Sequence, residues 1–345
     1  MKIVLIAPFE ETVPPKKYGG TELVIYNLAQ ELTKRNHEVW LIACGDSKTN
    51  AKLLPVFPKP LRAYPEANDM KSRDSLKYIG VGKVLENLKN IKTDIIHNHL
   101  GWRLLPFLPI IKAPVVTTLH GPLDTLHQKL VYGRFKDANY ISISFNQRKP
   151  MRNLNFVGNV YNGIEIEKFP FTEKVGNYLA FLGRMSPEKG PLQAIEAAKR
   201  AGLKLKMAAK VDAVDKDFFE SIIKPLIDGK QIEFIGEVGH KRKTEFLKNA
   251  LALLAPIQWE EPFGLYFIEA MACGTPVISF NRGSVPEIIK DKKTGFIVNS
   301  AKEMADVIKD IDRINRIDCR KHVEKNFTLE KMTSGYEKIY NKILN

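Results

Sequence analysis

Short β-branched apolar segments alternate with amphipathic stretches along roughly the first half of the chain. Ile3–Ile6 and Val115–Leu119 are almost uninterrupted apolar runs, which is typical of strands that are covered by helices on both faces. The pattern therefore predicts a parallel sheet. Its strands are expected at Lys2–Ala7, Glu38–Ala43, Asp94–His97, Val115–Leu119 and Tyr140–Ser144.

The segment between the first two strands predicts a helix. Thr21 can cap its N-terminus, and apolar residues at helical spacing between Leu23 and Leu32 give it one buried face, with an end near Arg35. Strand, helix and strand together form one βαβ unit.

A second series of the same kind begins after Tyr161-Asn-Gly-Ile164. Strands are expected at Tyr178–Leu182, Leu203–Ala208, Gln231–Ile235, Leu251–Ala255 and Pro276–Phe280. Helices are expected at Pro191–Ala201, Phe218–Ile227, Lys241–Ala250 and Leu265–Cys273. The fold class is therefore α/β, with two Rossmann-like doubly wound domains.

We place the first domain at residues 1–161 and the second at 162–327, with Glu165–Gly176 as the linker. Thr328–Ile343 carries an apolar stripe at helical spacing, so residues 328–345 are expected to form a C-terminal helix that packs back on the first domain. Ligands of doubly wound sheets bind beyond the carboxyl ends of the strands. Two such domains are therefore expected to face a cleft that holds the chemistry.

Composition agrees with two folded domains. Of the chain's residues, 44% are hydrophobic and 27% charged. Its length of 345 residues is more than one ordinary hydrophobic core accommodates. Its three cysteines, Cys44, Cys273 and Cys319, show no metal or redox spacing. The N-terminus lacks the features of a secretory leader, and no apolar run approaches the roughly 20 residues that cross a bilayer. We therefore expect a cytoplasmic protein.

The net charge of +14 is unevenly distributed. Residues 1–161 contain 23 basic and 13 acidic side chains, whereas residues 162–345 contain 30 and 26. A basic first domain favours partners that carry phosphate, such as an anionic membrane surface, a nucleic acid or a phosphorylated metabolite. Lysines that are simply solvated explain the charge equally well.

The most informative stretch runs from Gln258 to Val277, after a predicted buried strand. Pro262 and Gly264 set a turn before a helix that is expected to begin at Leu265. Its free N–H groups at Phe263, Gly264 and Leu265 would bind an anion or sugar oxygens. Glu269, one turn into this helix, can accept hydrogen bonds from a diol, and Glu261 precedes it by eight positions.

This stretch resembles the E-x7-E region of retaining GT-B glycosyltransferases of family 4, also called glycosyl transferases group 1. Further matches follow in the same order along nearly the whole chain. They are Tyr18-Gly-Gly-Thr-Glu22, Leu119-His-Gly121, Asn162-Gly-Ile-Glu165, Leu182-Gly-Arg-Met-Ser-Pro-Glu-Lys-Gly190 and Gly283-Ser-Val-Pro-Glu-Ile288.

The resemblance implies a nucleotide-sugar donor bound mainly to the second domain. Arg184 and Lys189 would hold the diphosphate and neutralise the charge that develops as it leaves. Glu261 and the amides after it would hold the sugar, and Glu269 would accept from the ribose hydroxyls. From the first domain, the amides at Gly19 and Gly20 would approach the diphosphate.

The family also implies that His120 reaches the sugar and that the leaving phosphate helps to deprotonate the acceptor. We therefore assign no nucleophile. No cofactor and no metal are expected, and the lack of a D-x-D motif near a predicted strand end agrees with this expectation.

Several other residues are weaker candidates. Glu237 and Val238 follow a predicted strand and could border the base. His97 and His99 have the spacing of metal ligands but no evident third ligand; an acceptor-site role and a structural role are the alternatives. Three polar residues after the last strand of the first domain could face donor or acceptor: Asn146, Arg148 and Arg152.

The favoured function is retaining hexosyl transfer, with UDP-glucose as the first candidate donor and GDP-mannose as the second. The acceptor would be a hydroxyl of a lipid, a glycan or a small molecule. Five cations between residues 71 and 89, in a stretch that could form a helix, suggest a peripheral enzyme of the inner membrane face. The alternatives are a nucleic-acid-binding protein or DNA-modifying sugar transferase, for which no recognition motif is present, and a sugar-nucleotide epimerase or glycoside phosphorylase.

Overall fold

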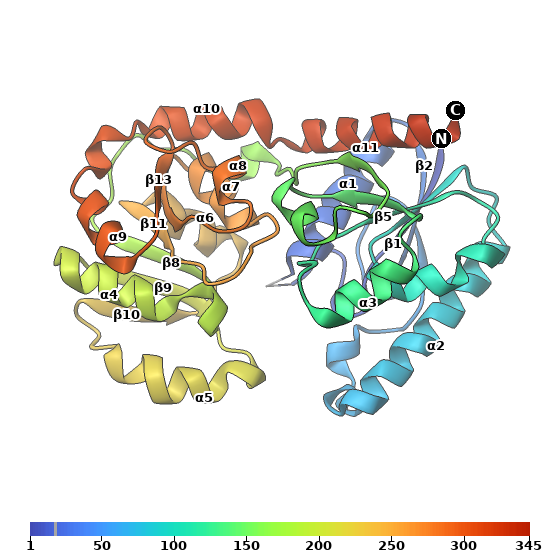
Figure 1. The fold of residues 1–345 in the computed structure, drawn as a ribbon, viewed down its shortest axis with the longest axis horizontal. Helices are drawn as coiled ribbons and strands as arrows, with labels where there is room; N and C mark the ends of the chain where they lie inside the picture. Colours follow the sequence, from blue (N-terminus) through green and yellow to red (C-terminus); the bar gives the residue numbers. More distant parts are fainter. Residues whose placement is uncertain (17–18) are drawn as a thin grey trace. The chain divides into compact units, whose positions relative to one another are not determined.

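The computed structural model describes residues 1–16 and 19–345 of the chain. Tyr18, the first residue of the predicted glycine loop, lies outside the described residues. The chain divides into two compact units, one formed by Met1–Gly163 with Leu329–Asn345 and the other by Ile164–Thr328 (Figure 1).

The first unit contains a parallel sheet, with seven strands among the residues that the structure describes. In chain order the strands are β1 (Lys2–Ile6), β2 (Glu38–Ala43), β3 (Lys52–Pro55), β4 (Ile95–Asn98), β5 (Val115–Thr118), β6 (Asn139–Ser142) and β7 (Phe156–Asn159). Their order across the sheet is β3-β2-β1-β4-β5-β6-β7. All five predicted strands are confirmed to within two residues at each end. The edge strands β3 and β7 were missed because they are short and only partly buried.

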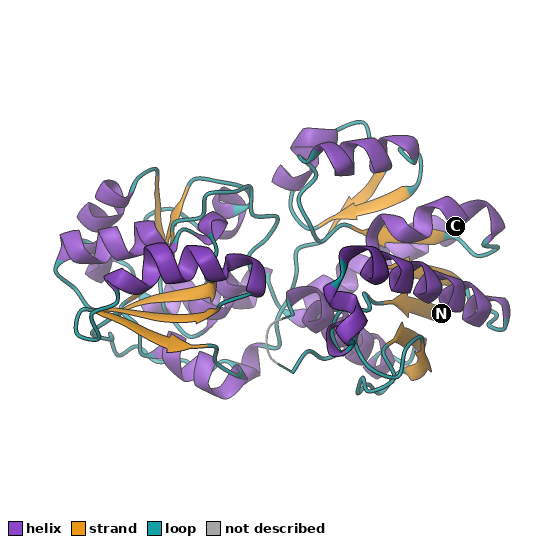
Figure 2. Ribbon diagram, turned by 90° about the horizontal axis from the view of Figure 1, so that it is seen from below, coloured by secondary structure: helices purple, strands orange, loops and turns teal. Residues whose placement is uncertain are grey.

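Helices cover both faces of this sheet (Figure 2). They are α1 (Gly20–Lys34), α2 (Met70–Lys89), α3 (Leu126–Arg134) and the C-terminal α11 (Leu329–Leu344). Short 3₁₀ segments lie at Leu61–Ala63, Pro65–Asn68, Gly101–Ile110 and Asn146–Met151. One local prediction is wrong: the residue at the N-cap of α1 is Gly19 and no side chain caps the helix, so Thr21 lies inside its first turn.

The second unit contains a six-stranded parallel sheet in the order β10-β9-β8-β11-β12-β13, counted within Ile164–Thr328. The strands are β8 (Leu179–Arg184), β9 (Leu205–Lys210), β10 (Ile232–Gly236), β11 (Ala252–Ala255), β12 (Val277–Phe280) and β13 (Gly295–Val298). The helices are α4 (Pro191–Ala201), α5 (Lys216–Phe218), α6 (His240–Lys248), α7 (Leu265–Ala272), α8 (Val285–Ile288), α9 (Ala301–Ile308) and α10 (Arg316–Asn326). A π-helical turn at Phe219–Ile223 continues α5, and 3₁₀ segments lie at Ile166–Lys168, Pro187–Lys189, Ala213–Asp215, Lys224–Leu226 and Ile311–Arg313.

Both sheets confirm the predicted Rossmann-like class, since every strand pair is parallel and all connections except the one from β2 to β3 contain a helical segment. The predicted strands and helices of the second unit are present, and β13 is an addition at the sheet edge. The expected cleft between the domains stays a prediction.

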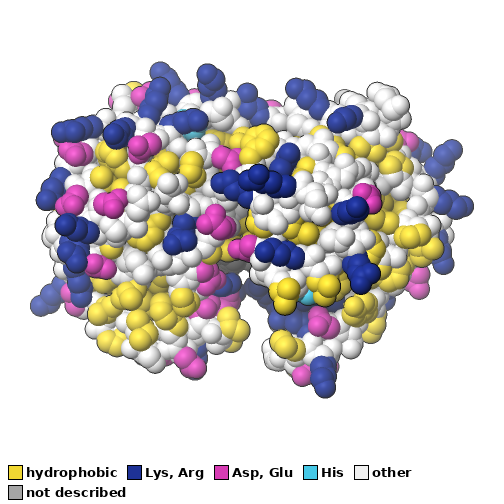
Figure 3. Space-filling view, in the orientation of Figure 1, with side chains coloured by type: hydrophobic (Ala, Val, Ile, Leu, Met, Phe, Trp, Pro, Cys, Tyr) yellow, Lys and Arg dark blue, Asp and Glu magenta, His cyan; other side chains and the backbone are white. Residues whose placement is uncertain are grey.

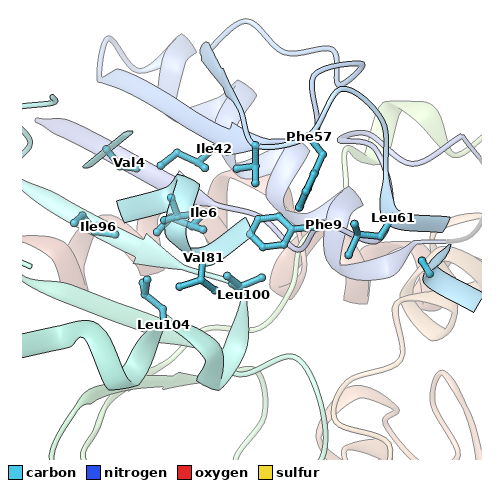
Figure 4. Packing of buried hydrophobic residues seen from close by; sticks show 13 residues of the cluster. Val4, Ile6, Phe9, Ile42, Phe57, Leu61, Val81, Ile96, Leu100 and Leu104 are labelled. Carbon is cyan, nitrogen blue, oxygen red and sulfur yellow. The ribbon is translucent and has the colours of Figure 1, made fainter. Parts of the chain in front are cut away.

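One core cluster of the first unit lies between the sheet and α2. Phe9 and Phe57 meet edge to face, with ring centroids 5.7 Å apart, and Val81 of α2 packs against the same cluster (Figure 4). Gly80 allows this close approach, because a Cβ at that position would lie 2.5 Å from the Phe9 ring.

The C-terminal helix packs on α1, as predicted. Arg35 lies just beyond α1 and donates to Glu31 of α1 at 2.9 Å. It also donates to two residues of α11, Glu337 at 2.6 Å and Ser334 at 2.9 Å. His37 lies 2.8 Å from the second oxygen of Glu337. Since Arg35 is about three quarters buried, this network contributes more than an exposed ion pair does.

Buried tyrosines of α11 also close over a histidine of β4. His97 is fully buried, with Nδ1 2.6 Å from the Tyr340 hydroxyl and Nε2 2.7 Å from Thr118 Oγ1. Burial holds the pKa of His97 well below its ordinary value, and it lowers the pKa of neighbouring His99 in the same way. Both rings are therefore neutral in the folded protein near pH 7.

This burial predicts acid sensitivity of the first unit. The unfolded chain takes up protons at these histidines below about pH 6.5, whereas the folded unit resists, so their contribution to stability is present above that pH and is lost as the pH falls. Between pH 7.5 and 5 we expect a loss of about 2 kcal/mol or more. Urea unfolding followed by hydrogen exchange of peptides from β4 and β5 measures it. The variant His97→Gln should show a weaker pH dependence; an unchanged dependence contradicts the assignment.

Candidate functional site

The polar residues of the second unit gather where its strand order reverses. β8 and β11 are neighbours in the sheet, yet the chain continues from β8 toward β9 on one side and from β11 toward β12 on the other. Loops that leave such a pair diverge at their carboxyl ends and leave room for a ligand. Arg184 is the last residue of β8, Lys189 ends the turn after it, and Glu261 follows β11.

Lys189 and Glu261 form a buried ion pair. Their side chains are 11% and 9% exposed, and the Lys189 ammonium also lies 4.9 Å from the Trp259 ring centroid and 5.2 Å from that of Tyr266. Aromatic faces favour a cation, so the ammonium is held at one position. The sequence-predicted clamp lysine and sugar-binding carboxylate are therefore brought together.

Arg184 is surrounded by carboxylates. It pairs with Glu188 of the same loop, and its Nε lies 3.0 Å from Asp215 and 4.0 Å from Asp212. Burial raises the pKa of Asp215. These aspartates correct one statement of the sequence analysis: Asp215-Lys-Asp217 is a D-x-D sequence beyond β9, and the carboxylate of Asp215 lies against the guanidinium of Arg184.

Two loops fix the backbone around Glu261. The Gln258 N–H donates to the Glu188 carbonyl at 2.8 Å, which joins the loops after β8 and β11. The Ser284 N–H donates to the Glu261 carbonyl at 2.9 Å. Gly283 has φ of +57°, and a Cβ there would lie 2.4 Å from the Glu261 backbone nitrogen. The motif at residues 283–288 therefore contacts the Glu261 backbone at Gly283, a position where any side chain would clash.

Helix α7 begins at this loop, as predicted. Gly264 precedes it with φ of +81°, no side chain caps its N-terminus, and Leu265 is its first residue. Phe263 is buried, and its carbonyl accepts from Ser284 Oγ at 2.8 Å. The amides predicted to meet the sugar thus lie at an N-terminus that no side chain closes.

Glu269 is buried inside α7 and bonded to a lysine that sequence reasoning missed. Its carboxylate accepts from the Lys243 ammonium of α6 at 2.5 Å, and the two side chains are 4% and 18% exposed. No local spacing joins the two residues, because they lie on different helices.

Glu237 and Val238 lie farther along the same edge. They follow β10, which is the edge strand. In the sheet, β9 lies between β10 and β8. Both are half-buried, and their loop leads to α6. The structure thus places them beside the helix that carries Lys243 and does not bring them into the Arg184 cluster.

Buried polar atoms without a hydrogen-bond partner are concentrated at this site. Seven occur in the described part of the chain, and four belong to residues of the site. Ser186 Oγ and Trp259 Nε1 have no hydrogen-bond partner among the described residues, whereas Arg184 Nε and Asp215 Oδ2 face each other at 3.0 Å as an ion pair without hydrogen-bond geometry. Native proteins satisfy nearly all buried polar atoms. A cluster of exceptions is typical of a surface prepared for a polar ligand.

The first unit brings three histidines to the carboxyl edge of its sheet. His120 follows β5 and its Nε2 lies 2.8 Å from Nδ1 of His99, which follows β4. Burial lowers the pKa of His120 to about 4. Within the described ranges, no group of three or more His, Cys, Asp or Glu side chains could hold a metal ion.

The two predicted glycines lie at the start of α1, Gly19 as its N-cap and Gly20 as its first residue. A Cβ at Gly19 would lie 2.6 Å from Pro15 Cβ, so a larger residue would displace this loop. Gly20 is exposed and begins α1. Glu22, the last residue of the predicted glycine motif, was assigned no role from the sequence. It is buried in α1, and burial raises its pKa to about 6.

Comparisons with known proteins agree with these features. A family model described as Glycosyl transferases group 1 matches residues 164–326, and one described as Glycosyltransferase Family 4 matches residues 18–153. YtcC of Bacillus subtilis is 28% identical over 100% of this chain and 93% of that protein. The phosphatidyl-myo-inositol mannosyltransferase of Mycobacterium tuberculosis is 25% identical over 86% of this chain and 82% of that protein.

A solved structure extends the likeness to the fold. HepE of Anabaena, in complex with UDP and glucose, has a TM-score of 0.78 at 16% identity and covers 99% of this chain and 100% of that chain. This likeness and the two parallel sheets establish the GT-B fold. The two family models together match most of the chain, and the chain therefore belongs to the family 4, or group 1, glycosyltransferases, enzymes that transfer a sugar from a nucleotide-sugar donor.

Proposed function

We propose that this glycosyltransferase moves glucose from UDP-glucose to a hydroxyl acceptor with retention of configuration and without a metal. The observation that carries the proposal is the group of cations at the reversal of the second sheet, where Lys189 pairs with Glu261 beside Trp259 and Arg184 pairs with Asp215. Fixed cations in a partly dry site are the groups that a leaving diphosphate needs.

The carboxylates around the cations suggest how the donor binds. Lys189 is paired with Glu261, and Arg184 with Glu188 and Asp215. An incoming diphosphate would take over the two cations and leave Glu261 to accept hydrogen bonds from the sugar. The cations would then neutralise the charge that grows as the bond to the sugar breaks, while a leaving-phosphate oxygen takes the proton of the acceptor hydroxyl.

The other site residues are proposed to have the roles that the family resemblance implies. Glu269 would accept from the ribose hydroxyls, and the open N-terminus of α7 would meet sugar oxygens through Phe263, Gly264 and Leu265. Glu237 and Val238 would border the base. His120, Gly19 and Gly20 would contact the donor from the first unit.

UDP-glucose is the first candidate because the solved structure of HepE holds UDP and glucose. GDP-mannose is the second, since one relative is a mannosyltransferase. Hexose identity depends on one or two hydrogen bonds, and no motif in this chain corresponds to them.

Calorimetric titration tests the donor. We expect one of UDP-glucose, UDP-N-acetylglucosamine and GDP-mannose to bind selectively without metal. The corresponding nucleoside diphosphate, UDP or GDP, should also bind when it is titrated alone. Glu269→Ala should weaken binding at least about tenfold, or about 1.4 kcal/mol, because the ribose loses its acceptor. Lys243→Met breaks the same ion pair but keeps the carboxylate, so its affinity should change much less. Equal losses would make Glu269 a structural partner of Lys243, and no binding by any donor would overturn the proposal.

Lys189→Met tests the clamp. Removal of one fixed charge that stabilises the transition state typically lowers turnover about 10²–10³-fold, and we expect a loss of this size in the release of the nucleoside diphosphate. Lys302→Met, an exposed lysine on α9, serves as the matched control and should retain wild-type turnover. A Lys189→Met enzyme as active as this control would remove Lys189 from the mechanism.

For the acceptor we propose a lipid or lipid-linked glycan at an anionic membrane surface. Helix α2 carries the predicted cations, and Met70 and Ile79 on it are 81% and 53% exposed. Two of the five cations, Arg73 and Lys77, pair with Glu10, so Lys71, Lys83 and Lys89 remain toward solvent. The phosphatidyl-myo-inositol mannosyltransferase among the relatives supports a lipid acceptor.

No helix in the described residues is long and apolar enough to cross a membrane. Lys and Arg side chains are spread over the face seen in Figure 3, with acidic side chains among them. Salt-dependent attachment would therefore rest on the exposed cations of α2 and not on the surface as a whole.

Vesicle sedimentation tests this attachment. At about 0.02 M salt the enzyme should sediment with vesicles of phosphatidylglycerol and phosphatidylcholine, and it should be released at about 0.5 M because salt screens the attraction. The double variant Lys71→Glu with Lys89→Glu should bind more weakly, whereas Lys302→Glu should not. Failure to sediment at low salt would leave a free glycan or small molecule as the acceptor.

A further inference from the structure

His120 is held at its backbone by a buried glutamine. Gln147 is 4% exposed, and its amide nitrogen donates to the carbonyl of Leu119 at 2.8 Å and to that of Gly121 at 2.7 Å. Its carbonyl accepts from the Ile143 N–H at 2.9 Å. The peptide group before His120 and the one after Gly121 are therefore held by the same side chain, which restricts the backbone around His120.

The ring of His120 is held by His99. Nε2 of His120 lies 2.8 Å from Nδ1 of His99. His99 is itself fixed, because its backbone N–H donates to the Ile6 carbonyl at 2.9 Å and its ring lies 3.9 Å, centroid to centroid, from that of His97. Both nitrogens of His97 are bonded elsewhere, to Tyr340 and Thr118. His97 therefore packs against His99 with its ring tilted by 40° and competes for neither of its nitrogens.

The buried surroundings decide which ring donates. Burial lowers the pKa of both histidines, that of His120 to about 4, so both are neutral near pH 7 and each carries one N–H. If His120 donated from Nε2, His99 would carry its proton on its own Nε2. That atom is buried and has no partner in the described part of the chain. A buried N–H without an acceptor costs more than a bare nitrogen lone pair in the same place.

We infer that His99 is a positioning residue, which donates from Nδ1 to Nε2 of His120 and thereby holds His120 as the tautomer that carries its proton on Nδ1. The Nδ1 of His120 has no partner among the described residues, and the ring is half-buried at the end of β5. His120 thus presents an N–H donor, suited to a sugar or acceptor oxygen, and does not serve as a base.

The catalytic part of this inference rests on the proposed function, whereas the tautomer does not. It also agrees with a mechanism in which the leaving phosphate takes the acceptor proton, since a histidine fixed as a donor leaves that step to the phosphate. A hydrogen-bonding partner that fixes the tautomer of a functional ring is a recognised means of orienting it.

Long-range ¹H–¹⁵N correlation spectra of the full chain with ¹⁵N-labelled histidine test the tautomer directly. The chain has seven histidines, and the signals of His120 are identified by their loss in His120→Gln. At pH 7.5 we expect His120 and His99 both to be protonated on Nδ1 only. A proton on Nε2 of His120, or a charged His120 at this pH, overturns the inference.

Two substitutions of His99 test positioning. His99→Leu removes the donor, so His120 should shift toward the Nε2–H tautomer that exposed imidazoles prefer. His99→Asn places an amide N–H near the position of Nδ1 and should restore the wild-type tautomer. His127→Leu is the control, because exposed His127 packs on Trp102 and does not contact His120. Circular dichroism and thermal unfolding establish that each variant is folded.

Turnover gives the functional arm. Release of nucleoside diphosphate should fall about tenfold to a hundredfold in His99→Leu, because misplaced groups cost rates of this order, and should recover in His99→Asn. Donor affinity should fall less than turnover does, since the proposed cation clamp lies in the second unit. Unchanged turnover in a folded His99→Leu that has lost the tautomer overturns the positioning role. If the wild-type chain binds no donor, the proposed function fails, and the spectra of the wild-type chain still decide the tautomer.

Discussion

The constraint on which the rest of this structure depends is the parallel pairing of strands that are buried on both faces. A parallel sheet brings all its carboxyl ends to one edge, and the order of its strands decides which loops meet there. In the second unit the reversal between β8 and β11 gathers Arg184, Lys189 and Glu261. In the first unit the adjacent strands β4 and β5 bring His99 to His120. Residues far apart in sequence thus become neighbours without any local motif.

Burial of charge is the second constraint. Lys189 with Glu261, and Lys243 with Glu269, are almost enclosed pairs. An enclosed charge without a partner costs far more than the pair gains. Carboxylates that bind a sugar or a ribose therefore need nearby cations when the ligand is absent, and the cations of a phosphate clamp need carboxylates. Under the proposed function the same side chains would serve the empty and the occupied site, and the ligand would exchange ion-pair partners without leaving any charge buried and unpaired.

The sequence carried most of the fold because continuous apolar runs identify central strands of a parallel sheet. It failed at β3, β7 and β13, which lie at sheet edges where strands are short and the sheet needs less apolar surface. At the site, family motifs identified residues at strand ends and helix starts. Lys243 and Gln147 were not predicted, because their roles come from contacts that form only in the folded chain. The D-x-D sequence at Asp215 escaped because its meaning depends on Arg184, which lies on another strand.

The histidine cluster links the site of the first unit to the last helix of the chain. Tyr340 of α11 bonds His97, His97 packs on His99, and His99 bonds His120. Each ring is fixed by the next because burial leaves it neutral and with few partners to choose from. The helix that returns to the first unit thus does more than cover a face of the sheet. Through Tyr340 it covers His97 and keeps water away from the buried rings. Without this cover, the rings would contact water and nothing would select a single tautomer of His120.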